Sequence, residues 1–282
     1  MIKVINSGFY STIQDLGRMG YQHFGVPYSG VMDRYSASLA NSLLGNNQNA
    51  AVIEMTMAGA KLEFNCSTSI CISGADMSPQ LNATKISLNK SIAVKQGDVL
   101  SFGKMNTGFR CYLAVSGGID TEIVMSSRSM YKDITKRYVL AKNDNLSIIE
   151  SLAVNEKHAS VKINKFQFSS EIIEVLKGPE FDKLSATQIE ALCSTKFVIS
   201  KDNNRMGYQL EQTVANNLDA IITSLVMPGT VQLTPSGKLI VLMRDCQTTG
   251  GYPRILQLKE SAIHVLAQKY TGKRFSFRLL DY

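Results

Sequence analysis

Tryptophan is absent from the 282-residue chain, and histidine occurs only three times. Without an indole ring, the protein does not hold its ligand on a tryptophan platform. The three histidines, His23, His158 and His264, stand far apart with no cysteine cluster beside them, and no HExxH motif occurs. Because zinc needs several such ligands together, we expect no protein-ligated metal centre.

Three common active-site motifs are also missing from the sequence. No GxSxG occurs, so the serine nucleophile of an α/β-hydrolase is not supported. There is no GxGxxG of the dinucleotide-binding type. Gly237-Lys238 and Gly272-Lys273 lack the upstream glycine and the following Ser or Thr of a P-loop. A nucleotide site in this chain would therefore be of a different type.

The chain also lacks the marks of a membrane or secreted protein. No stretch approaches the roughly 18 apolar residues of a membrane span. The N-terminus, Met1–Gly8, lacks the basic flank and apolar run of a signal peptide. The five cysteines contain no CxxC pair, and an odd number in a chain of this length favours reduced thiols. We therefore expect a cytoplasmic location and no membrane association.

Charge gives little support for a nucleic-acid partner. The 30 Lys and Arg against 23 Asp and Glu give a formal charge of +7, which is basic enough to raise the question. Nucleic-acid-binding proteins gather their cations on one stripe or arm. Here the cations are scattered, and no run is longer than a pair such as Lys273–Arg274. We expect no nucleic acid, although a local anion site remains compatible with the sequence.

Short runs of alternating apolar and polar residues, separated by Gly, Asn and Asp, dominate the chain and predict strands. The run Cys111–Val115 lacks polar alternation, which predicts a strand covered on both faces. Many strands and few helices favour a mainly β fold of barrels or sandwiches. The predicted strands contain Leu62–Phe64, Ile70–Ile72, Ile86–Leu88, Ile92–Val94, Val99–Phe102, Cys111–Val115, Val231–Leu233, Leu239–Met243 and Phe275–Leu279.

Three helices interrupt the predicted strands. Asp33 fits the N-cap of a helix with Tyr35, Leu39, Ala40, Leu43 and Leu44 on one face, ended by Gly45. Ser185 and Gln188 form a capping-box pattern ahead of a second helix. A third helix carries Ile263–Tyr270 and stops at Gly272. Polar residues dominate Ser151–Phe168, where we place the junction between two lobes, 1–155 and 156–282.

Two polar segments punctuated by glycine are the candidate working surfaces. Thr12–Asp33 concentrates amide, carboxylate, guanidinium and hydroxyl groups, and Asp245–Arg254 directly follows a predicted buried strand. Glycines let a backbone approach a ligand closely, but turns between strands need the same residue types. Both interpretations remain open at this point. Cys246 has no histidine near it in sequence, which favours an inert thiol over a nucleophile.

These segments, with several others, resemble the carboxyltransferase-domain family. This family contains the C subunit of bacterial 5-oxoprolinase, the KipA regulator and the so-called allophanate hydrolase subunit 2. The likeness runs through nearly the whole chain in order. The matching strings are Thr12-Ile-Gln-Asp-Leu-Gly-Arg18, Gly20-Tyr21, Gly25-Val-Pro27, Ser29-Gly30, Met32-Asp33, Ala40-Asn41, Leu44-Gly45-Asn46, Glu54-Met-Thr56, Leu113-Ala-Val-Ser-Gly-Gly-Ile119, Ser127-Arg-Ser129, Arg205-Met-Gly-Tyr208, Pro228-Gly-Thr-Val-Gln232 and Gln247-Thr-Thr-Gly-Gly-Tyr-Pro-Arg254.

The resemblance implies two cyclophilin-like β-barrel lobes and a role as the C subunit of a bacterial ATP-dependent 5-oxoprolinase. Such a protein would act with the KipI-like B subunit of 5-oxoprolinase and with its A subunit, using ATP with Mg²⁺ to phosphorylate 5-oxoproline before hydrolysis to glutamate. Two alternatives stay open. One is a KipA-like regulatory protein that antagonises an anti-kinase partner, and the other is a carboxyltransferase for a urea-like amide.

Roles for individual residues follow from this hypothesis. Phosphorylating an amide oxygen needs positioned hydrogen bonds and cationic stabilisation. The expected catalytic residues are Asp15, Arg18, Arg205 and Asp245. The expected substrate-binding residues are Gln14, Tyr208, Gln247, Thr248, Thr249, Gly250, Gly251, Tyr252 and Arg254. A plain salt bridge is the simpler interpretation of either aspartate.

Two departures from the family pattern concern the loops. Between Ser129 and Leu140 the family usually carries a glycine-rich stretch, whereas this chain has Met130–Val139, which contains no glycine. Gln212 replaces a glycine after the Gly207-Tyr208 motif. Both changes leave the fold prediction intact, and the local loop shape and the choice of substrate stay open.

Overall fold

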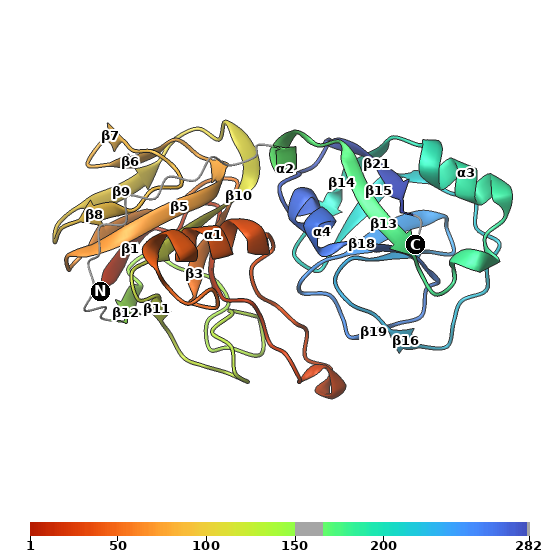
Figure 1. Ribbon diagram of the computed structural model, residues 1–282. Helices are drawn as coiled ribbons and strands as arrows, with labels where there is room; N and C mark the ends of the chain where they lie inside the picture. The colour runs from red at the N-terminus through yellow and green to blue at the C-terminus, as the bar shows by residue number, and fades with distance from the viewer. Residues whose placement is uncertain (150–165, 281–282) are drawn as a thin grey trace. The chain divides into compact units, whose positions relative to one another are not determined.

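Strands make up most of the regular secondary structure in the computed structural model, which describes residues 1–149 and 166–280 (Figure 1). The chain divides into two units. One contains Met1–Arg18 and Ser29–Asn164, and the other contains Met19–Tyr28 and Lys165–Tyr282. The expected junction at Ser151–Phe168 lies largely outside the described residues, so the boundary after residue 155 stays a prediction. Three helices of eight or more residues occur in the described ranges, consistent with the mainly β fold.

Within residues 1–149, the first unit contains two open sheets. The seven-stranded sheet has the order β11-β12-β1-β4-β9-β6-β7, and the five-stranded sheet has the order β2-β3-β10-β5-β8. The strands are β1 Ile2–Asn6, β2 Tyr10–Gln14, β3 Val52–Thr56, β4 Lys61–Phe64, β5 Thr68–Asp76, β6 Pro79–Leu81, β7 Thr84–Lys85, β8 Ile92–Val94, β9 Val99–Phe102, β10 Thr107–Val115, β11 Ile119–Asp120 and β12 Asn145–Ile148.

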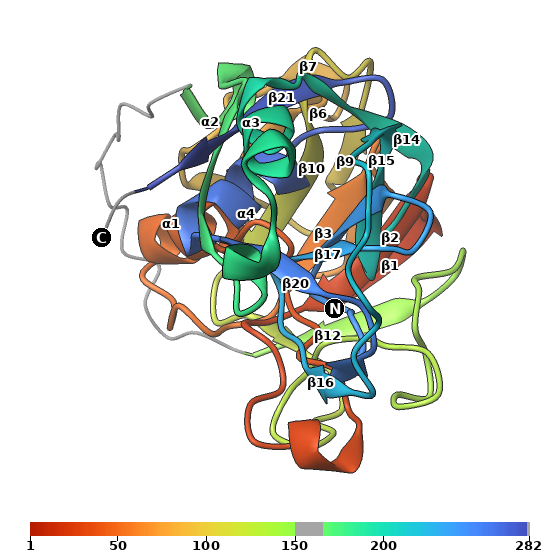
Figure 2. The same ribbon diagram turned by 90° about the vertical axis from the view of Figure 1, so that its right-hand side faces the viewer.

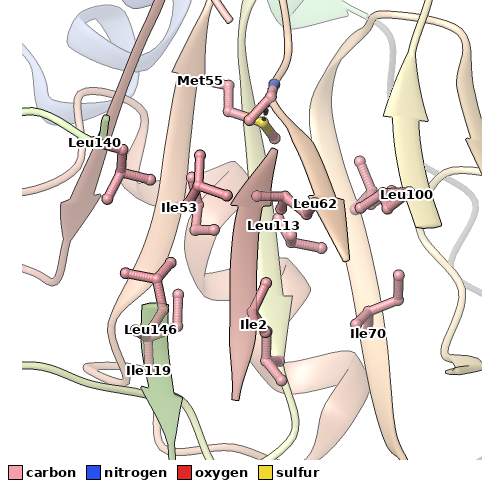
Figure 3. Packing of buried hydrophobic residues seen from close by; sticks show 14 of the residues in the cluster. Ile2, Ile53, Met55, Leu62, Ile70, Leu100, Leu113, Ile119, Leu140 and Leu146 are labelled. Carbon is pink, nitrogen blue, oxygen red and sulfur yellow. Dashed lines mark hydrogen bonds between the residues drawn. The ribbon is translucent and has the colours of Figure 1, made fainter. Parts of the chain in front are cut away.

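The main core of this unit lies between the two sheets, because its cluster draws residues from both. Ile2 and Leu62 come from the seven-stranded sheet, and Ile53 and Leu113 come from the five-stranded sheet (Figure 3). The opposite face of the five-stranded sheet packs against helix α1, Arg34–Leu44, through Tyr112 and other residues of a second cluster. Strand β10 is therefore covered on both faces, as its unbroken apolar run predicted.

Helix α1 begins and ends where its local sequence predicted. The Asp33 side chain accepts a hydrogen bond from the Ser36 N–H at 3.1 Å, and Gly45 ends the helix with φ 74°. A left-handed residue at this position favours glycine, which has no Cβ to clash. The assignment of Tyr35 to the apolar face was wrong, since Tyr35 is 43% exposed and Ala37 packs inward instead.

The second unit is built around a closed barrel of seven strands in the order β13-β20-β17-β18-β15-β14-β21 (Figures 1 and 2). Phe197, Phe275 and Phe277 pack against one another with ring centroids 5.2 to 6.3 Å apart. A two-stranded sheet of β16 and β19 lies outside the barrel strands. The strands are β13 Ile172–Lys177, β14 Phe197–Asn203, β15 Gly207–Thr213, β16 Ser224–Leu225, β17 Thr230–Leu233, β18 Lys238–Leu242, β19 Thr249–Gly250, β20 Arg254–Leu258 and β21 Arg274–Leu279.

Helices are short in this unit. The capping box predicted for α3, Ala186–Ser194, is present, with the Gln188 side chain accepting from the Ser185 N–H at 2.8 Å. Helix α4 spans Glu260–Ala267, so it ends before Tyr270 rather than continuing to Gly272. The remaining helices are α2 Phe166–Ser169 and the 3₁₀ turns η1 Gln22–Phe24 and η2 Phe181–Lys183. No helix in the described part of the chain is long and apolar enough to cross a bilayer.

Two further fold predictions need correction. A barrel was expected in each lobe, but only the second unit has a closed barrel among the described strands, while the first has two open sheets. Residues 86–88 alternate in polarity but lie outside strand β7. Alternation alone does not make a strand, because backbone groups also need a neighbouring strand to pair with. The cysteines are free thiols, as expected.

Candidate functional site

A pocket of about 300 Å³ opens on the outer face of the barrel in the second unit. Side chains alternate along a strand, so neighbouring positions face opposite sides of the barrel wall. Tyr208, Val231 and Val241 form a fully buried row across β15, β17 and β18, and they face the barrel interior. The residues between them face outward and form the pocket wall. The pocket is lined by Asp202, Asn204, Met206, Gly207, Gln209, Gln232, Ile240, Leu242, Gln247 and Tyr252.

Strand register explains how distant parts of the sequence meet in this wall. Gln232 of β17 lies opposite Ile240 of β18, and Ile240 lies opposite Gln209 of β15. The next row pairs Leu242 with Gly207. A Cβ at Gly207 would lie 3.2 Å from the Ile240 side chain, so glycine leaves this part of the floor open. The floor is thus apolar, with one carboxamide on each side of Ile240.

Carboxamides provide most of the polar groups around the apolar floor. Gln209, Gln232, Asn204 and Gln247 each offer an amide donor and a carbonyl acceptor. Tyr252, 39% exposed, adds an aromatic ring. A few placed polar groups over an apolar surface are typical of a site for a small organic ligand. The arrangement suits a planar molecule that both donates and accepts hydrogen bonds.

Gln232 differs from the other carboxamides in its burial. It is only 1% exposed, and its Nε2 has no hydrogen-bond partner among the residues that the structure describes. A Cβ at Gly250 would lie 2.5 Å from this Nε2, so the missing side chain of Gly250 makes room for the Gln232 carboxamide. Buried polar groups are almost always paired, which makes this one unusual.

Strands β16 and β19 form a small antiparallel sheet beside Gln232. Leu225 pairs with Thr249, and Ser224 pairs with Gly250. The Val226 N–H donates to the Thr248 carbonyl at 3.0 Å, which continues the pairing. Thr248, Gly250 and Gly251 are half-buried here, while Thr249 is exposed. We call residues 221–226 and 248–251 the cover segment.

Arg254 holds the cover segment to the barrel. Its Nε and Nη2 donate to the Glu180 carboxylate at 3.0 and 2.8 Å, and its Nη1 donates to the Leu225 carbonyl at 2.9 Å. The hydrogen bonds between Arg254 and Glu180 lower the pKa of Glu180 and raise the pKa of Arg254. Because its Nε, Nη1 and Nη2 atoms all donate hydrogen bonds within the fold, Arg254 links Glu180 to β16.

Arg205 and Asp245 form a buried ion pair close to the same pocket wall. Arg205 Nε and Nη2 lie 2.8 and 3.0 Å from the two Asp245 carboxylate oxygens. The Asp245 N–H also donates to the Arg205 carbonyl at 2.9 Å. The pair joins the start of β15 to the segment after β18. The salt bridge anticipated for Asp245 is therefore present.

Two further residues considered from the sequence, Tyr208 and Cys246, are not part of the pocket lining. Tyr208 is fully buried within the barrel, and its hydroxyl donates to the Lys269 carbonyl at 3.4 Å. Cys246 is buried beside Val226 and Leu242, and burial raises its thiol pKa to about 12. A thiol with so high a pKa stays protonated at neutral pH and is a poor nucleophile. This agrees with the inert role expected for Cys246.

Gln14, Asp15 and Arg18 belong to the first unit, where all three are buried. The Asp15 carboxylate accepts from the Ser127 and Ser129 hydroxyls at 2.6 Å each and from the Arg128 N–H at 2.7 Å. In this structure Asp15 therefore holds the Ser127-Arg-Ser129 motif in place.

Gln14 and Arg18 fasten the same loop. Gln14 donates to the Met130 carbonyl at 3.1 Å and accepts from the Gly30 N–H at 3.1 Å. Arg18 donates to the carbonyls of Ser129 and Val124 at 2.5 and 3.1 Å. Their contacts are internal to the fold, and the predicted roles in ligand binding stay predictions.

A second cavity, of about 530 Å³, lies in the first unit and was not foreseen from the sequence. Its charged lining consists largely of pairs, Arg128 with Asp120 at 2.9 Å and Arg137 with Asp144. It includes part of the segment that departs from the family pattern. The pocket on the barrel also contains residues that sequence reasoning did not assign. Gln232 was available as a signal, since it stands between two apolar residues of a predicted strand.

Comparison with known proteins places these features in a family. The profile of the carboxyltransferase domain, subdomain A and B, matches residues 24–279. The chain is 32% identical to the C subunit of 5-oxoprolinase from Escherichia coli (strain K12), over 98% of this chain and 90% of that protein. The chain therefore belongs to the carboxyltransferase-domain family. Three motifs of the resemblance, at Arg205–Tyr208, Pro228–Gln232 and Gln247–Arg254, converge on the barrel pocket.

Solved structures show the same fold in longer proteins. The TTHA0988 structure matches with TM-score 0.89 and 26% identity, over 98% of this chain and 55% of that one. The Kluyveromyces lactis urea amidolyase matches with TM-score 0.88 and 27% identity, over 99% of this chain and 19% of that one. This chain thus spans about half of the first protein and about a fifth of the second.

Proposed function

We propose that the chain is the C subunit of an ATP-dependent 5-oxoprolinase and that it binds the small cyclic amide on which the complex acts. The carboxamide-lined pocket on the barrel is the observation that carries this proposal. The similarity to the corresponding 5-oxoprolinase subunit of Escherichia coli, over nearly the full length of both proteins, supports it. The B subunit of 5-oxoprolinase, which is KipI-like, and the A subunit complete the enzyme, which we place in the cytoplasm.

The pocket is better equipped for positioning than for covalent chemistry. Its lining offers amides, one aromatic ring and the carboxylate of Asp202, while the nearby Cys246 thiol stays protonated. Holding a reactant in the correct geometry can by itself lower a reaction barrier by several kcal/mol, on the order of 7 to 11 in favourable cases. We therefore assign substrate positioning to this protein, with its partners supplying further catalytic groups.

ATP with Mg²⁺ remains part of the proposal, but two of the arginines predicted for the site do not fit phosphate binding here. Arg205 is paired with Asp245, and Arg254 is paired with Glu180. A bidentate carboxylate occupies the same donor fork that a phosphate would need. No group of three His, Cys, Asp or Glu side chains is gathered as metal ligands in residues 1–149 and 166–280. We propose that the KipI-like partner holds the nucleotide.

The test is ATP consumption that depends on 5-oxoproline, measured for this chain alone and after mixing with the B and A subunits. We expect turnover only in the mixture, with one glutamate formed per substrate consumed. Complex formation without turnover would contradict the proposal and favour a KipA-like regulatory protein. Arg18→Ala and Thr248→Ala in the assembled complex would show whether those two predicted site residues affect the reaction.

The likeness to urea amidolyase favours one second candidate, carboxyl transfer to a urea-like amide. Both candidates require recognition of an amide, so the same pocket serves either. They differ in the co-reactant, because carboxyl transfer needs a carboxylated biotin carrier. Carboxylation of urea by this chain with such a carrier, in the absence of 5-oxoproline turnover, would replace the first candidate with the second.

A further inference from the structure

The unpaired Nε2 of Gln232 is the polar group in the barrel pocket that most requires a ligand. This Nε2 is buried without a partner in the described ranges, whereas Thr230 of the same strand donates its hydroxyl to the Gln257 side chain at 2.9 Å. A buried donor left unsatisfied destabilises the folded state. Such a group is explained when a ligand completes its hydrogen bonds.

We propose that Gln232 recognises the amide of the substrate by a paired set of hydrogen bonds, an inference that rests on the proposed function. A carboxamide presents an N–H donor and a C=O acceptor on one edge. A ring amide holds its own N–H and C=O on the same side, because the ring forces the cis geometry. The two edges are complementary, so each amide donates once and accepts once.

The surroundings of Gln232 fit the rest of such a ligand. The last torsion of a glutamine side chain is broad, so rotation about it turns the edge that carries both the N–H and the carbonyl towards the pocket. Ile240 and Leu242 form an apolar floor for ring methylenes, and Tyr252 supplies an aromatic surface. A pocket of about 300 Å³ suits a small ligand of this kind.

This assignment selects a chemical class. Small lactams and, more weakly, primary amides present both a donor and an acceptor, whereas an N-methylated lactam has lost the donor. A site built on hydrogen bonds rejects an analogue that leaves its buried groups unpaired. We expect 5-oxoproline to bind and N-methyl-5-oxoproline and proline to bind at least about tenfold more weakly.

The experiment measures the dissociation constant of 5-oxoproline by calorimetry for the full chain, and its KM in the assembled complex. Gln232→Leu removes the hydrogen bonds with little change in size, and we expect about a tenfold or greater loss of affinity. Gly250→Ala places a Cβ 2.5 Å from Gln232 Nε2 and should displace the carboxamide, with a similar loss.

Gln257→Leu is the matched control on the neighbouring strand. Its carboxamide is engaged by Thr230 and by the Pro228 carbonyl and is not part of the pocket lining. At a temperature where the variant is folded, its affinity should match that of the unchanged chain.

The outcomes separate this inference from the proposed function. Glutamate formation by a complex carrying Gln232→Leu, at unchanged KM, would overturn the inference and leave the 5-oxoprolinase proposal intact. Lactam binding that depends on Gln232, without turnover in any mixture, would support the inference and contradict the 5-oxoprolinase proposal. No saturable lactam binding by either the chain or the complex would overturn the inference.

Discussion

Gln232→Leu should stabilise the second unit in the absence of ligand, although it removes a polar group from the site. Leaving a buried donor unpaired costs about 1 to 3 kcal/mol, and replacing it with an apolar side chain of similar shape regains part of that cost. Gln232 is 1% exposed and packs against Gly250, so the leucine methyls remain buried. We expect a gain of about 1 kcal/mol in the free energy of unfolding.

Urea unfolding, followed by circular dichroism, measures this difference, and calorimetry should show a rise in Tm of roughly 3 to 5 °C. Gln257→Leu provides the contrast on the adjacent strand. Its side chain makes hydrogen bonds of 2.9 Å with Thr230 and 3.0 Å with the Pro228 carbonyl. Losing both should cost about 2 kcal/mol.

The opposite result for Gln232 would contradict its assignment as an unpaired ligand-binding group. If Gln232→Leu lowers the free energy of unfolding by more than about 1 kcal/mol, the carboxamide must be hydrogen-bonded in the unliganded fold. Its presence would then be explained by stability alone. A gain in stability together with a loss of lactam affinity would instead show that the residue is kept for binding at the expense of stability.

Three further predictions concern residues around the proposed site and in the first unit. Glu180→Gln should lower the free energy of unfolding in urea by about 2 kcal/mol, because it weakens the ion pair with Arg254. The pKa of Glu180 in the folded chain lies below its ordinary 4.5. The stabilisation by this ion pair is therefore present above about pH 4.5 and is lost as the pH falls through the lowered pKa. Equal dependence of the unfolding free energy on pH for the unchanged chain and Glu180→Gln would contradict this. Cys246 should resist alkylation at pH 8 while exposed Cys193 reacts, as mass spectrometry of labelled peptides would show; rapid labelling of Cys246 in the folded chain would disprove its burial. Asp15→Asn should cost the first unit about 2 kcal/mol, since an amide cannot accept equally from both serine hydroxyls, and an unchanged urea midpoint would count against the structural role.

The sequence predicted the helix ends, because these depend on contacts between residues close together in the chain. Asp33 and Gly45 fixed both ends of α1 because each acts within one turn of the helix. The Ser185–Gln188 capping box is likewise a contact over three residues. The alternation at Ile86–Leu88 failed because a strand also depends on a partner that the segment itself does not contain.

The candidate site depends on contacts between distant residues, and these were harder to foresee. Gln232 and Gln209 lie on either side of Ile240 only because of the registers of β15, β17 and β18. The partner of Arg254 is Glu180, which is 74 positions away and outside both polar segments singled out in the sequence. A ligand-binding arginine and a structural arginine carry the same charge, and only the position of a carboxylate separates them.

The most direct test of the proposed binding site is a crystal structure of the chain grown with 5-oxoproline. We expect the lactam ring on Ile240 and Leu242, with its amide edge hydrogen-bonded to the Gln232 carboxamide. A ligand found instead in the charged cavity of the first unit, with Gln232 unchanged, would contradict the assignment of the site.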